Sequence, residues 1–461
     1  MNFLFLSIED LNDFIEPLGG HPEVRTPNIA RLAARSAVFE RAYATAPACS
    51  PARAAALFGQ APWRTGIYAN GHDWRMVHKT GQRLSIVGHM RDAGFATIGA
   101  GKIFHLAEAG IDPDEWDDYF VAGRRRHPPT SALARAGEFG PNMDYGPAES
   151  DEPQYDELNA ERIVAEMTRG ADGRFWALGL FRPHLPCIVP QRFFDLYPEE
   201  VALPPGMPGP FDMEDERELA SVPAEARRFI IRPIGQKIHR GRDYNAFLRA
   251  YLASISYADW LVGRLLDRLE DQGLMDSTTI VLWSDHGYQV GEKLAFTKFT
   301  LWERALRIPM MVAGPGIVPR RLGQPATNMD LFPTLLALAG ARPKQETDGR
   351  DLSALLAGGP EDGDAAACAV WGLFPPPKGK DLLAVTARTR RHRFTRYWKG
   401  GEELYDHDAD PFERRNLLAA PLLGRVARAG LRARLAATLP APLAKPLPLK
   451  SREERLAMAE D

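Results

Sequence analysis

Short apolar runs that end in polar or acidic residues are the feature of this sequence that most restricts its fold. Residues 2–8 read Asn-Phe-Leu-Phe-Leu-Ser-Ile and are followed directly by Glu9 and Asp10. Residues 175–180 and 277–283 form similar runs, and segments with helical periodicity separate them. Apolar runs of this length are typical of strands that are buried on both faces of a sheet. The pattern predicts an α/β fold with polar residues gathered at one sheet edge.

The length of the chain favours two domains of unequal size. A chain of 461 residues exceeds what one hydrophobic core usually serves. Residues 358–364 are rich in Gly and Asp, which is typical of a linker. We therefore expect a larger domain over residues 1–350 and a smaller one over residues 365–461, with antiparallel strands at 383–388 and 393–398.

Composition excludes several classes of protein. The formal net charge is −3, with both signs spread along the chain, which argues against a nucleic-acid or membrane-surface protein. The three cysteines cannot form a disulfide framework, and their scarcity suits a reducing compartment. The first residues lack the basic start and long apolar region of a secretory signal peptide, and no apolar run reaches membrane-spanning length. We expect a cytoplasmic protein.

A cysteine precedes a predicted helix. Pro51 suits the first turn of a helix, and the Ala-rich residues after it have high helix propensity. Cys49 then lies at the helix N-terminus, where unpaired N–H groups favour an anion, and Arg53 follows one turn later. This predicts an anion site with a reactive sulfur at its entrance. A half-buried packing cysteine would have the same local pattern.

Two pairs of oxygen and nitrogen donors follow predicted strands. Glu9 and Asp10 come after the first strand, and Asp285 and His286 come after the strand at 277–283. The carboxyl ends of neighbouring parallel strands lie at one edge, so the pairs can meet around a divalent cation. Taken separately, each pair also suits a polar turn after a strand.

Further charged and imidazole side chains follow other strands. Lys102 and His105 come just after a strand at 96–99, where they could bind an anion and transfer a proton. His184 has Pro183 before it and a second proline two residues after it, and proline restricts the backbone on both sides.

These segments, taken in order, resemble the sulfatase family of the alkaline phosphatase superfamily. Cys49-Ser50-Pro51-Ala52-Arg53 resembles its C-x-P-x-R signature, which continues here through Leu57 and Gly59. The other matching segments are Glu9-Asp10, Gly101-Lys102-Ile103-Phe104-His105, Arg182-Pro183-His184-Leu185-Pro186, Ser284-Asp285-His286-Gly287 and Lys298. The chain most resembles the iduronate-sulfatase-like branch, and the resemblance extends over nearly its whole length.

The resemblance implies a fold. We expect a large mixed, mostly parallel β-sheet between layers of helices, with a smaller C-terminal α+β domain built on an antiparallel sheet. The larger domain would then be catalytic.

The resemblance also implies cofactors and residue roles. Cys49 would be converted to formylglycine by a formylglycine-generating enzyme, and Ca²⁺, with Mg²⁺ or Mn²⁺ as alternatives, would be held by Glu9, Asp10, residue 49, Asp285 and His286. The other implied catalytic residues are Arg53 and Lys102 at the hydrated aldehyde, Lys298 and His184 at the sulfate and the leaving alcohol, and His105 as a base. The implied substrate contacts are Asp73, Trp74, Arg75 and Arg182. Two of these positions depart from the family pattern, since Glu9 replaces the usual Asp and Arg182 replaces a common Lys.

The expected activity is hydrolysis of a sulfate monoester, from a saccharide or another small sulfate ester. Two alternatives stay open: a phosphonate monoester or phosphodiester hydrolase of the same superfamily, and a non-catalytic anion-binding protein with an unmodified Cys49. The sequence also leaves open whether the chain forms a homo-oligomer.

Overall fold

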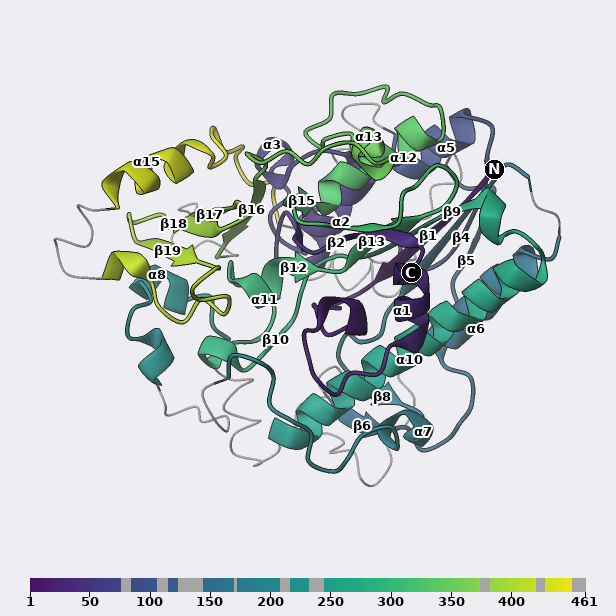
Figure 1. The fold of residues 1–461 in the computed structure, drawn as a ribbon, viewed down its shortest axis with the longest axis horizontal. Helices are drawn as coiled ribbons and strands as arrows, with labels where there is room; N and C mark the ends of the chain where they lie inside the picture. Colours follow the sequence, from purple (N-terminus) through teal and green to yellow (C-terminus); the bar gives the residue numbers. More distant parts are fainter. Residues whose placement is uncertain are drawn as a thin grey trace.

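The structure is a computed structural model, and Figure 1 shows its fold. It describes residues 1–75, 84–105, 115–122, 144–169, 172–207, 216–231, 244–373, 382–419 and 428–449. Among these residues, no helix has the length and apolar character needed to cross a membrane.

An eight-stranded sheet forms the centre of the larger part of the chain. Its central strand, β1 (Asn2–Ile8), pairs in parallel with β7 (Arg174–Leu180) on one side and β9 (Thr278–Ser284) on the other. The remaining strands, listed outward, are β4 (Ala96–Gly101) and β5 (Asp118–Phe120) beyond β7, and β13 (Met310–Ala313), β2 (Ser36–Phe39) and β14 (Arg320–Leu322) beyond β9. Only β13 runs antiparallel to its two neighbours within this sheet. The sheet is therefore mixed and mostly parallel, as predicted.

Helices cover both faces of this sheet (Figure 1). The helices whose buried residues share an apolar cluster with Leu4 and Leu6 are α1 (Pro27–Ala33), α6 (Tyr155–Glu166) and the long α10 (Tyr244–Asp271). Those that share a cluster with Phe3 and Phe5 are α2 (Cys49–Phe58), α5 (Ile86–Asp92) and α12 (Leu331–Leu338). Successive side chains of β1 thus enter opposite layers, which is why this strand is apolar throughout.

A second, antiparallel sheet lies at the left of Figure 1. It consists of β16 (Ala367–Gly372), β17 (Leu383–Arg388), β18 (His392–Arg396) and β19 (Glu402–Asp406), in that order. Trp371 and Tyr405 of this sheet belong to the same apolar cluster as Phe3. A final helix, α15 (Ala429–Ala437), follows this sheet, and residues 420–427 lie outside the described part of the chain. The boundaries 350 and 365 stay a prediction.

The remaining described elements are short. They are β3 (Ala42–Tyr43), α3 (Pro62–Thr65), β6 (Tyr145–Pro147), β8 (Cys187–Val189), α7 (Gln191–Phe194), α8 (Ala224–Arg227), β10 (Gln289–Val290), β11 (Phe296–Thr297), α11 (Glu303–Leu306), β12 (Arg307–Ile308), β15 (Ala326–Thr327), α13 (Ser353–Leu356), and 3₁₀ turns at Glu16–Leu18, Glu216–Leu219, Met275–Ser277, Glu292–Leu294, Asn328–Asp330 and Leu417–Ala419.

Candidate active site

The two predicted donor pairs lie together where β1 and β9 end. Ile8 is in register with Ser284, so the residues that follow leave the sheet at the same edge. The backbone N–H of Asp10 donates to Oδ1 of Asp285 at 3.1 Å. Asp10 has a left-handed φ of 58°, a conformation that non-glycine residues adopt rarely and that concentrates at functional sites. The edge thus brings together side chains that lie 275 positions apart.

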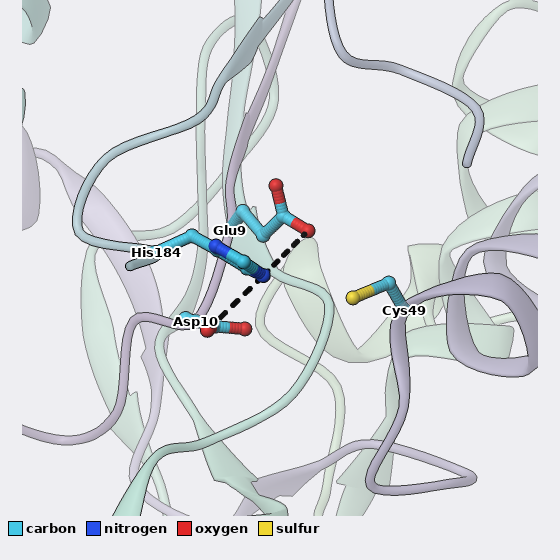
Figure 2. A group of neighbouring side chains, drawn as sticks. All are labelled: Glu9, Asp10, Cys49 and His184. Atoms are coloured by element: carbon cyan, nitrogen blue, oxygen red, sulfur yellow. Dashed lines mark ion pairs between the residues drawn. The ribbon is translucent and has the colours of Figure 1, made fainter. Parts of the chain in front are cut away.

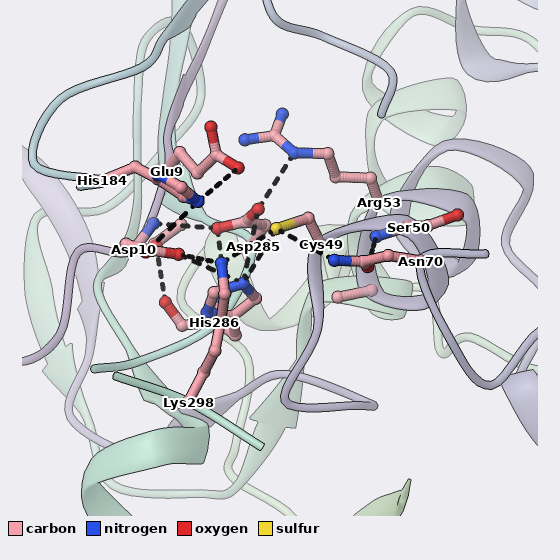
Figure 3. A network of polar contacts seen from close by, with 12 residues as sticks. Glu9, Asp10, Cys49, Ser50, Arg53, Asn70, His184, Asp285, His286 and Lys298 are labelled. Atoms are coloured by element: carbon pink, nitrogen blue, oxygen red, sulfur yellow. Dashed lines mark hydrogen bonds and ion pairs between the residues drawn. The ribbon is translucent and has the colours of Figure 1, made fainter. Parts of the chain in front are cut away.

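Cys49 faces this edge from the N-terminus of α2 (Figure 3). The helix begins at Cys49 itself, with Ala48 as its N-cap, so the cysteine lies in the first turn rather than just before it. Its side chain is buried, yet Sγ lies 3.1 Å from Nζ of Lys298 and 3.4 Å from Nε2 of His286. A structural cysteine would have apolar neighbours instead.

The donor atoms around Cys49 suit a divalent cation. Ligand atoms of Glu9, Asp10, Cys49 and His184 all lie within 4.8 Å of one another, and a second such group joins Cys49 to Asp285 and His286. Figure 2 shows the His184 ring between the two carboxylates, with the Cys49 sulfur pointing toward them from the other side.

One carboxylate oxygen in this group supports the same conclusion. Oε2 of Glu9 is buried and has no hydrogen-bond partner among the described residues. Hard cations prefer carboxylate oxygens, and imidazole nitrogen is a common additional ligand. The residues present therefore fit a metal ion.

Two buried lysines balance the carboxylates. Lys102 forms an ion pair with Glu9, and Nζ of Lys298 lies 2.8 Å from Oδ1 of Asp10. Burial alone would raise the pKa of Glu9, but Lys102 and His184 hold it well below its usual range. Burial would also raise the pKa of the Cys49 thiol, but the Lys298 ammonium lowers it overall. The site favours negative charge at position 49.

Asp285 and His286 polarise each other. Burial works to lower the pKa of His286, but the neighbouring Asp285 carboxylate raises it to about 9. Burial works to raise the pKa of Asp285, but His286 and Arg53 lower it to about 2. The Asp285 carboxylate, which follows β9, is therefore negatively charged at neutral pH.

Arg53 holds this arrangement together from inside. Its Nε donates to Oδ2 of Asp285 at 3.0 Å, and its Nη1 donates to the carbonyl oxygens of Lys102 at 2.7 Å and Ile103 at 3.0 Å. Through these contacts, Arg53 positions the Asp285 carboxylate and the backbone that follows β4. Its implied contact with a hydrated aldehyde stays a prediction.

His184 faces the carboxylates of Glu9 and Asp10, and a carboxylate that the sequence did not point to holds the residues before it. Its Nε2 lies 3.9 Å from Oε1 of Glu9 and 3.8 Å from Oδ2 of Asp10. Asp156, in the first turn of α6, accepts the backbone N–H groups of Phe181 at 2.8 Å and Arg182 at 2.7 Å. Burial lowers the pKa of His184 to about 4, so its imidazole is neutral at neutral pH. Neutral imidazole suits ligation or hydrogen bonding better than proton donation.

Family models match both parts of the chain. Residues 1–341 match the model named Sulfatase, and residues 291–439 match the model named N-sulphoglucosamine sulphohydrolase, C-terminal. The chain belongs to the sulfatase family. The family expected from the motifs is thus confirmed, and it makes this sulfatase-family protein an enzyme of the sulfatase type.

Curated relatives of this sulfatase-family chain act on different compounds, according to their names. A sulfatase of Formosa agariphila is 30% identical over 89% of this chain and 82% of its own length. A choline-sulfatase of Rhizobium meliloti is 30% identical over 91% of this chain and 83% of its own length. An iduronate 2-sulfatase of Mus musculus is 30% identical over 72% of this chain and 62% of its own length.

A solved structure supports the fold. The phosphonate monoester hydrolase of Agrobacterium radiobacter superimposes with a TM-score of 0.76 over 100% of this chain and 95% of the other, at 20% identity. The expected alkaline-phosphatase-like architecture with a C-terminal antiparallel sheet is confirmed.

Asp73, Trp74 and Arg75, the residues after α3 that the family resemblance implied as substrate contacts, mostly contact other residues of this sulfatase. The indole of Trp74 is 7% exposed and stacks on Phe104, with ring centroids 4.6 Å apart. Arg75 pairs with Asp73, whose Oδ1 lies 3.0 Å from its Nε. The burial of Trp74 favours a packing role. The half-buried His105 accepts the Trp74 indole N–H at its carbonyl oxygen, and its role as base stays a prediction.

Arg182 also occupies a packing position. Its guanidinium is buried, donates from Nε to the carbonyl oxygen of Ile188 at 3.2 Å, and lies over the Phe181 ring at 5.3 Å. These contacts favour support of the His184 segment over direct substrate contact.

Two further residues at the site escaped sequence analysis. Nδ2 of Asn70 lies 4.0 Å from Sγ of Cys49, and its Oδ1 accepts the N–H of Ser50 at 2.9 Å. The hydroxyl of Tyr251, in the N-terminal third of α10, donates to the carbonyl oxygen of Asp10 at 2.8 Å. The Asn70-Gly71 pair signals a turn, whereas nothing in the helical pattern separates Tyr251 from a core residue.

Proposed function

We propose that this chain hydrolyses a sulfate monoester after Cys49 has been oxidised to formylglycine. The observation that carries the proposal is the position of the Cys49 sulfur, which lies between Lys298 and His286 at the edge that bears three buried carboxylates. Family membership supports the reaction class.

The residues that would hold the metal are Glu9, Asp10, Asp285 and His286, with calcium as the proposed ion and Mg²⁺ or Mn²⁺ as alternatives. His184 is a further candidate because its Nε2 belongs to the same group of ligand atoms as Glu9 and Asp10. When bound, such an ion supplies positive charge that stabilises the ester oxygens and the deprotonated nucleophile.

The reaction would proceed as a displacement at sulfur followed by an elimination of sulfate from residue 49. One hydroxyl of the hydrated aldehyde loses its proton and attacks sulfur, and the bond between sulfur and the alcohol oxygen breaks as that oxygen gains a proton. The second hydroxyl then loses its proton, the aldehyde C=O reforms, and the C–O bond to sulfate breaks. Water rehydrates the aldehyde, so the enzyme returns to its starting state.

The charged groups around residue 49 supply the electrostatic stabilisation. Nζ of Lys298 lies beside Sγ of Cys49, whose place a hydroxyl of the hydrated aldehyde would take, so Lys298 can stabilise the negative charge of that oxygen, and Asp10 fixes its position. Lys102 keeps Glu9 ionised through their ion pair. His184 faces the same atoms and can hydrogen-bond a sulfate oxygen.

The test starts with mass spectrometry of the peptide that contains residue 49. Protein made together with a formylglycine-generating enzyme should carry the formylglycine mass and release sulfate from sulfate esters, and Cys49→Ala should do neither. A thiol mass at position 49 in that material would instead support a non-catalytic anion-binding protein. Faster cleavage of a phosphodiester than of a sulfate ester of the same phenol would favour the phosphodiesterase alternative.

A further inference from the structure

A cavity of about 360 Å³ shares a residue, Asn70, with the surroundings of the reactive cysteine. Asn70 forms part of its wall and, on its other side, lies 4.0 Å from the Cys49 sulfur. Figure 3 shows the Asn70 amide pointing toward that sulfur. Phe299, which follows the Cys49 neighbour Lys298 in the chain, lines the cavity as well. Asn70 and the adjacent residues Lys298 and Phe299 thus connect the cavity with the site at residue 49.

The walls of the cavity are mostly apolar and rich in aromatic rings. Phe299 and Trp371 stack with their ring centroids 5.3 Å apart and their planes inclined by 23°. Phe229 adds a third ring, and Ile231 and Leu373 add aliphatic surface. Such walls favour a flat ring with weakly polar faces.

The backbone beside Lys298 is strained in a way that serves both the reaction centre and the cavity. Thr297 has a φ of 68° and Phe299 a φ of 78°, which are unusual values for residues with side chains. Between them, Lys298 reaches Cys49 and Asp10, while Phe299 lines the cavity. Strain of this kind persists only where the surroundings enforce it, and it concentrates at binding sites.

Arg228 brings positive charge to the cavity. It is exposed, lines the cavity and lies over the Trp398 ring at 5.8 Å. Within the described ranges of the chain, no carboxylate forms an ion pair with it, so its guanidinium is available to an anionic group.

We propose that this cavity binds the leaving group of the substrate and that the leaving group is an aromatic alcohol with a negatively charged substituent. The proposal rests on the proposed sulfatase function and names its substrate class. The ring would lie against Phe299 and Trp371, and its anionic substituent would face Arg228.

Two other classes of leaving group suit these walls less well. Among the described lining residues, only Asn70, Arg228 and the indole N–H of Trp371 offer polar side-chain groups, so the hydroxyl groups of a pyranose would lose water without enough replacement partners. A quaternary ammonium would suit aromatic walls, but Arg228 would repel it.

The first test compares sulfate release from four esters by the formylglycine-containing enzyme. We expect kcat/KM to be highest for 3-carboxyphenyl sulfate, then phenyl sulfate, with glucuronic acid 2-sulfate and choline sulfate well below both. A preference for either of the last two would overturn the proposal. If the enzyme cleaves a phosphodiester but none of the four sulfate esters, the sulfatase function itself is refuted.

A matched pair of variants then tests Arg228. Arg228→Ala should reduce the ratio of kcat/KM for 3-carboxyphenyl sulfate to that for phenyl sulfate about fivefold, the upper range for an exposed ion pair. Lys399→Ala removes an equal charge from an exposed residue next to Trp398 and outside the cavity lining, and it should leave the ratio unchanged. Equal effects of the two variants would mean that Arg228 acts only through general charge.

Binding of the product tests the cavity without any turnover. 3-Hydroxybenzoate should bind the enzyme in calorimetry, and Trp371→Ala should weaken that binding about tenfold through loss of ring contact. Trp371 is 7% exposed, so Trp371→Phe, which keeps a ring in the wall, serves as the folded comparison and should lose less. Equal binding by all three proteins would place the leaving group elsewhere, whatever the outcome of the sulfate assays.

Discussion

Nε of Arg53 lies 3.0 Å from Oδ2 of Asp285, and the side chains of both residues are fully buried although 232 positions separate them in the chain. This contact joins the helix that begins with Cys49 to the end of β9. The same guanidinium donates to two carbonyl oxygens after β4, so one side chain fixes three segments around the site.

Arg53→Lys should lower kcat/KM about 100-fold and weaken metal binding. A lysine has one ammonium in place of the planar fork, so it cannot reach Asp285 and the carbonyl oxygens together. Steady-state kinetics over a metal titration measure both effects. Arg64→Lys, at an exposed arginine that pairs with Glu346 at 2.9 Å, is the control and should match the wild type. An unaltered metal titration for Arg53→Lys would contradict this role.

Lys298→Ala should lower kcat about 100- to 1000-fold, since a preorganised charge beside a developing anion contributes on that scale. Lys298→Arg keeps the charge but cannot place it equally close to Cys49, and we expect an intermediate loss. Rapid-quench or steady-state assays on a single sulfate ester measure kcat. The formylglycine content must be determined for each variant by mass spectrometry, and a normal kcat at full conversion would exclude the proposed role.

Glu9→Gln should destabilise the metal-free protein by about 3–5 kcal/mol, because it leaves the buried Lys102 ammonium without its partner. Glu9→Asp keeps the negative charge and should cost less. Urea unfolding in the presence of a chelator, followed by tryptophan fluorescence, compares the two variants. A smaller loss for Gln than for Asp would show that the Lys102–Glu9 pair does not govern stability.

Asp156 should make stability depend on pH. Burial raises its pKa from 3.8 to about 6, so between these values the folded protein keeps a proton that the unfolded chain releases. The free energy of unfolding therefore falls as pH rises through this window, by up to about 3 kcal/mol. Asp156→Asn should lack this decline.

Urea unfolding at fixed pH values between 4 and 7 measures the difference between wild type and Asp156→Asn. Asp276→Asn removes a carboxylate that is 94% exposed and should keep the wild-type dependence. Asp156→Asn should also lower kcat/KM, because an amide has one acceptor for the two N–H groups that hold the His184 segment. If the free energy of unfolding depends on pH in the same way for Asp156→Asn and the wild type, Asp156 is not the group that causes the decline.

Arg393→Met should loosen the C-terminal sheet. Nε of Arg393 lies 2.6 Å from Oε1 of Glu413 and its Nη2 lies 2.5 Å from Oε2 of Glu303, which belongs to the larger part of the chain. Loss of the buried arginine leaves these carboxylates poorly compensated, at a cost of about 3–5 kcal/mol.

Limited proteolysis with mass spectrometry would detect earlier cleavage in the C-terminal region of Arg393→Met. Arg391→Met is the control, since that side chain is 56% exposed and solvent screens its pair with Asp406, which therefore contributes little to stability. Equal cleavage rates in the two variants would contradict a stabilising role for the Arg393 pairs.

Local pattern was sufficient to predict the sheet edge but not the contacts across it. The apolar runs at β1 and β9 match the strands to within a residue at each end, because burial on both faces leaves a continuous apolar signal. Asn70, Asp156 and Tyr251 act through neighbours far away in the chain, and only the packed fold shows those neighbours. Trp74 illustrates the reverse case, since a loop position near the motifs turned out to be buried.

The stacking of Phe299 on Trp371 joins the loop next to the reaction centre to β16 of the C-terminal sheet. One wall of the cavity is thus encoded in the C-terminal sheet, which does not contain the strands that precede the carboxylates. Replacing residues of β16 can redirect the enzyme toward another alcohol and leave the sulfur chemistry intact, which makes that strand the place to begin directed evolution of selectivity.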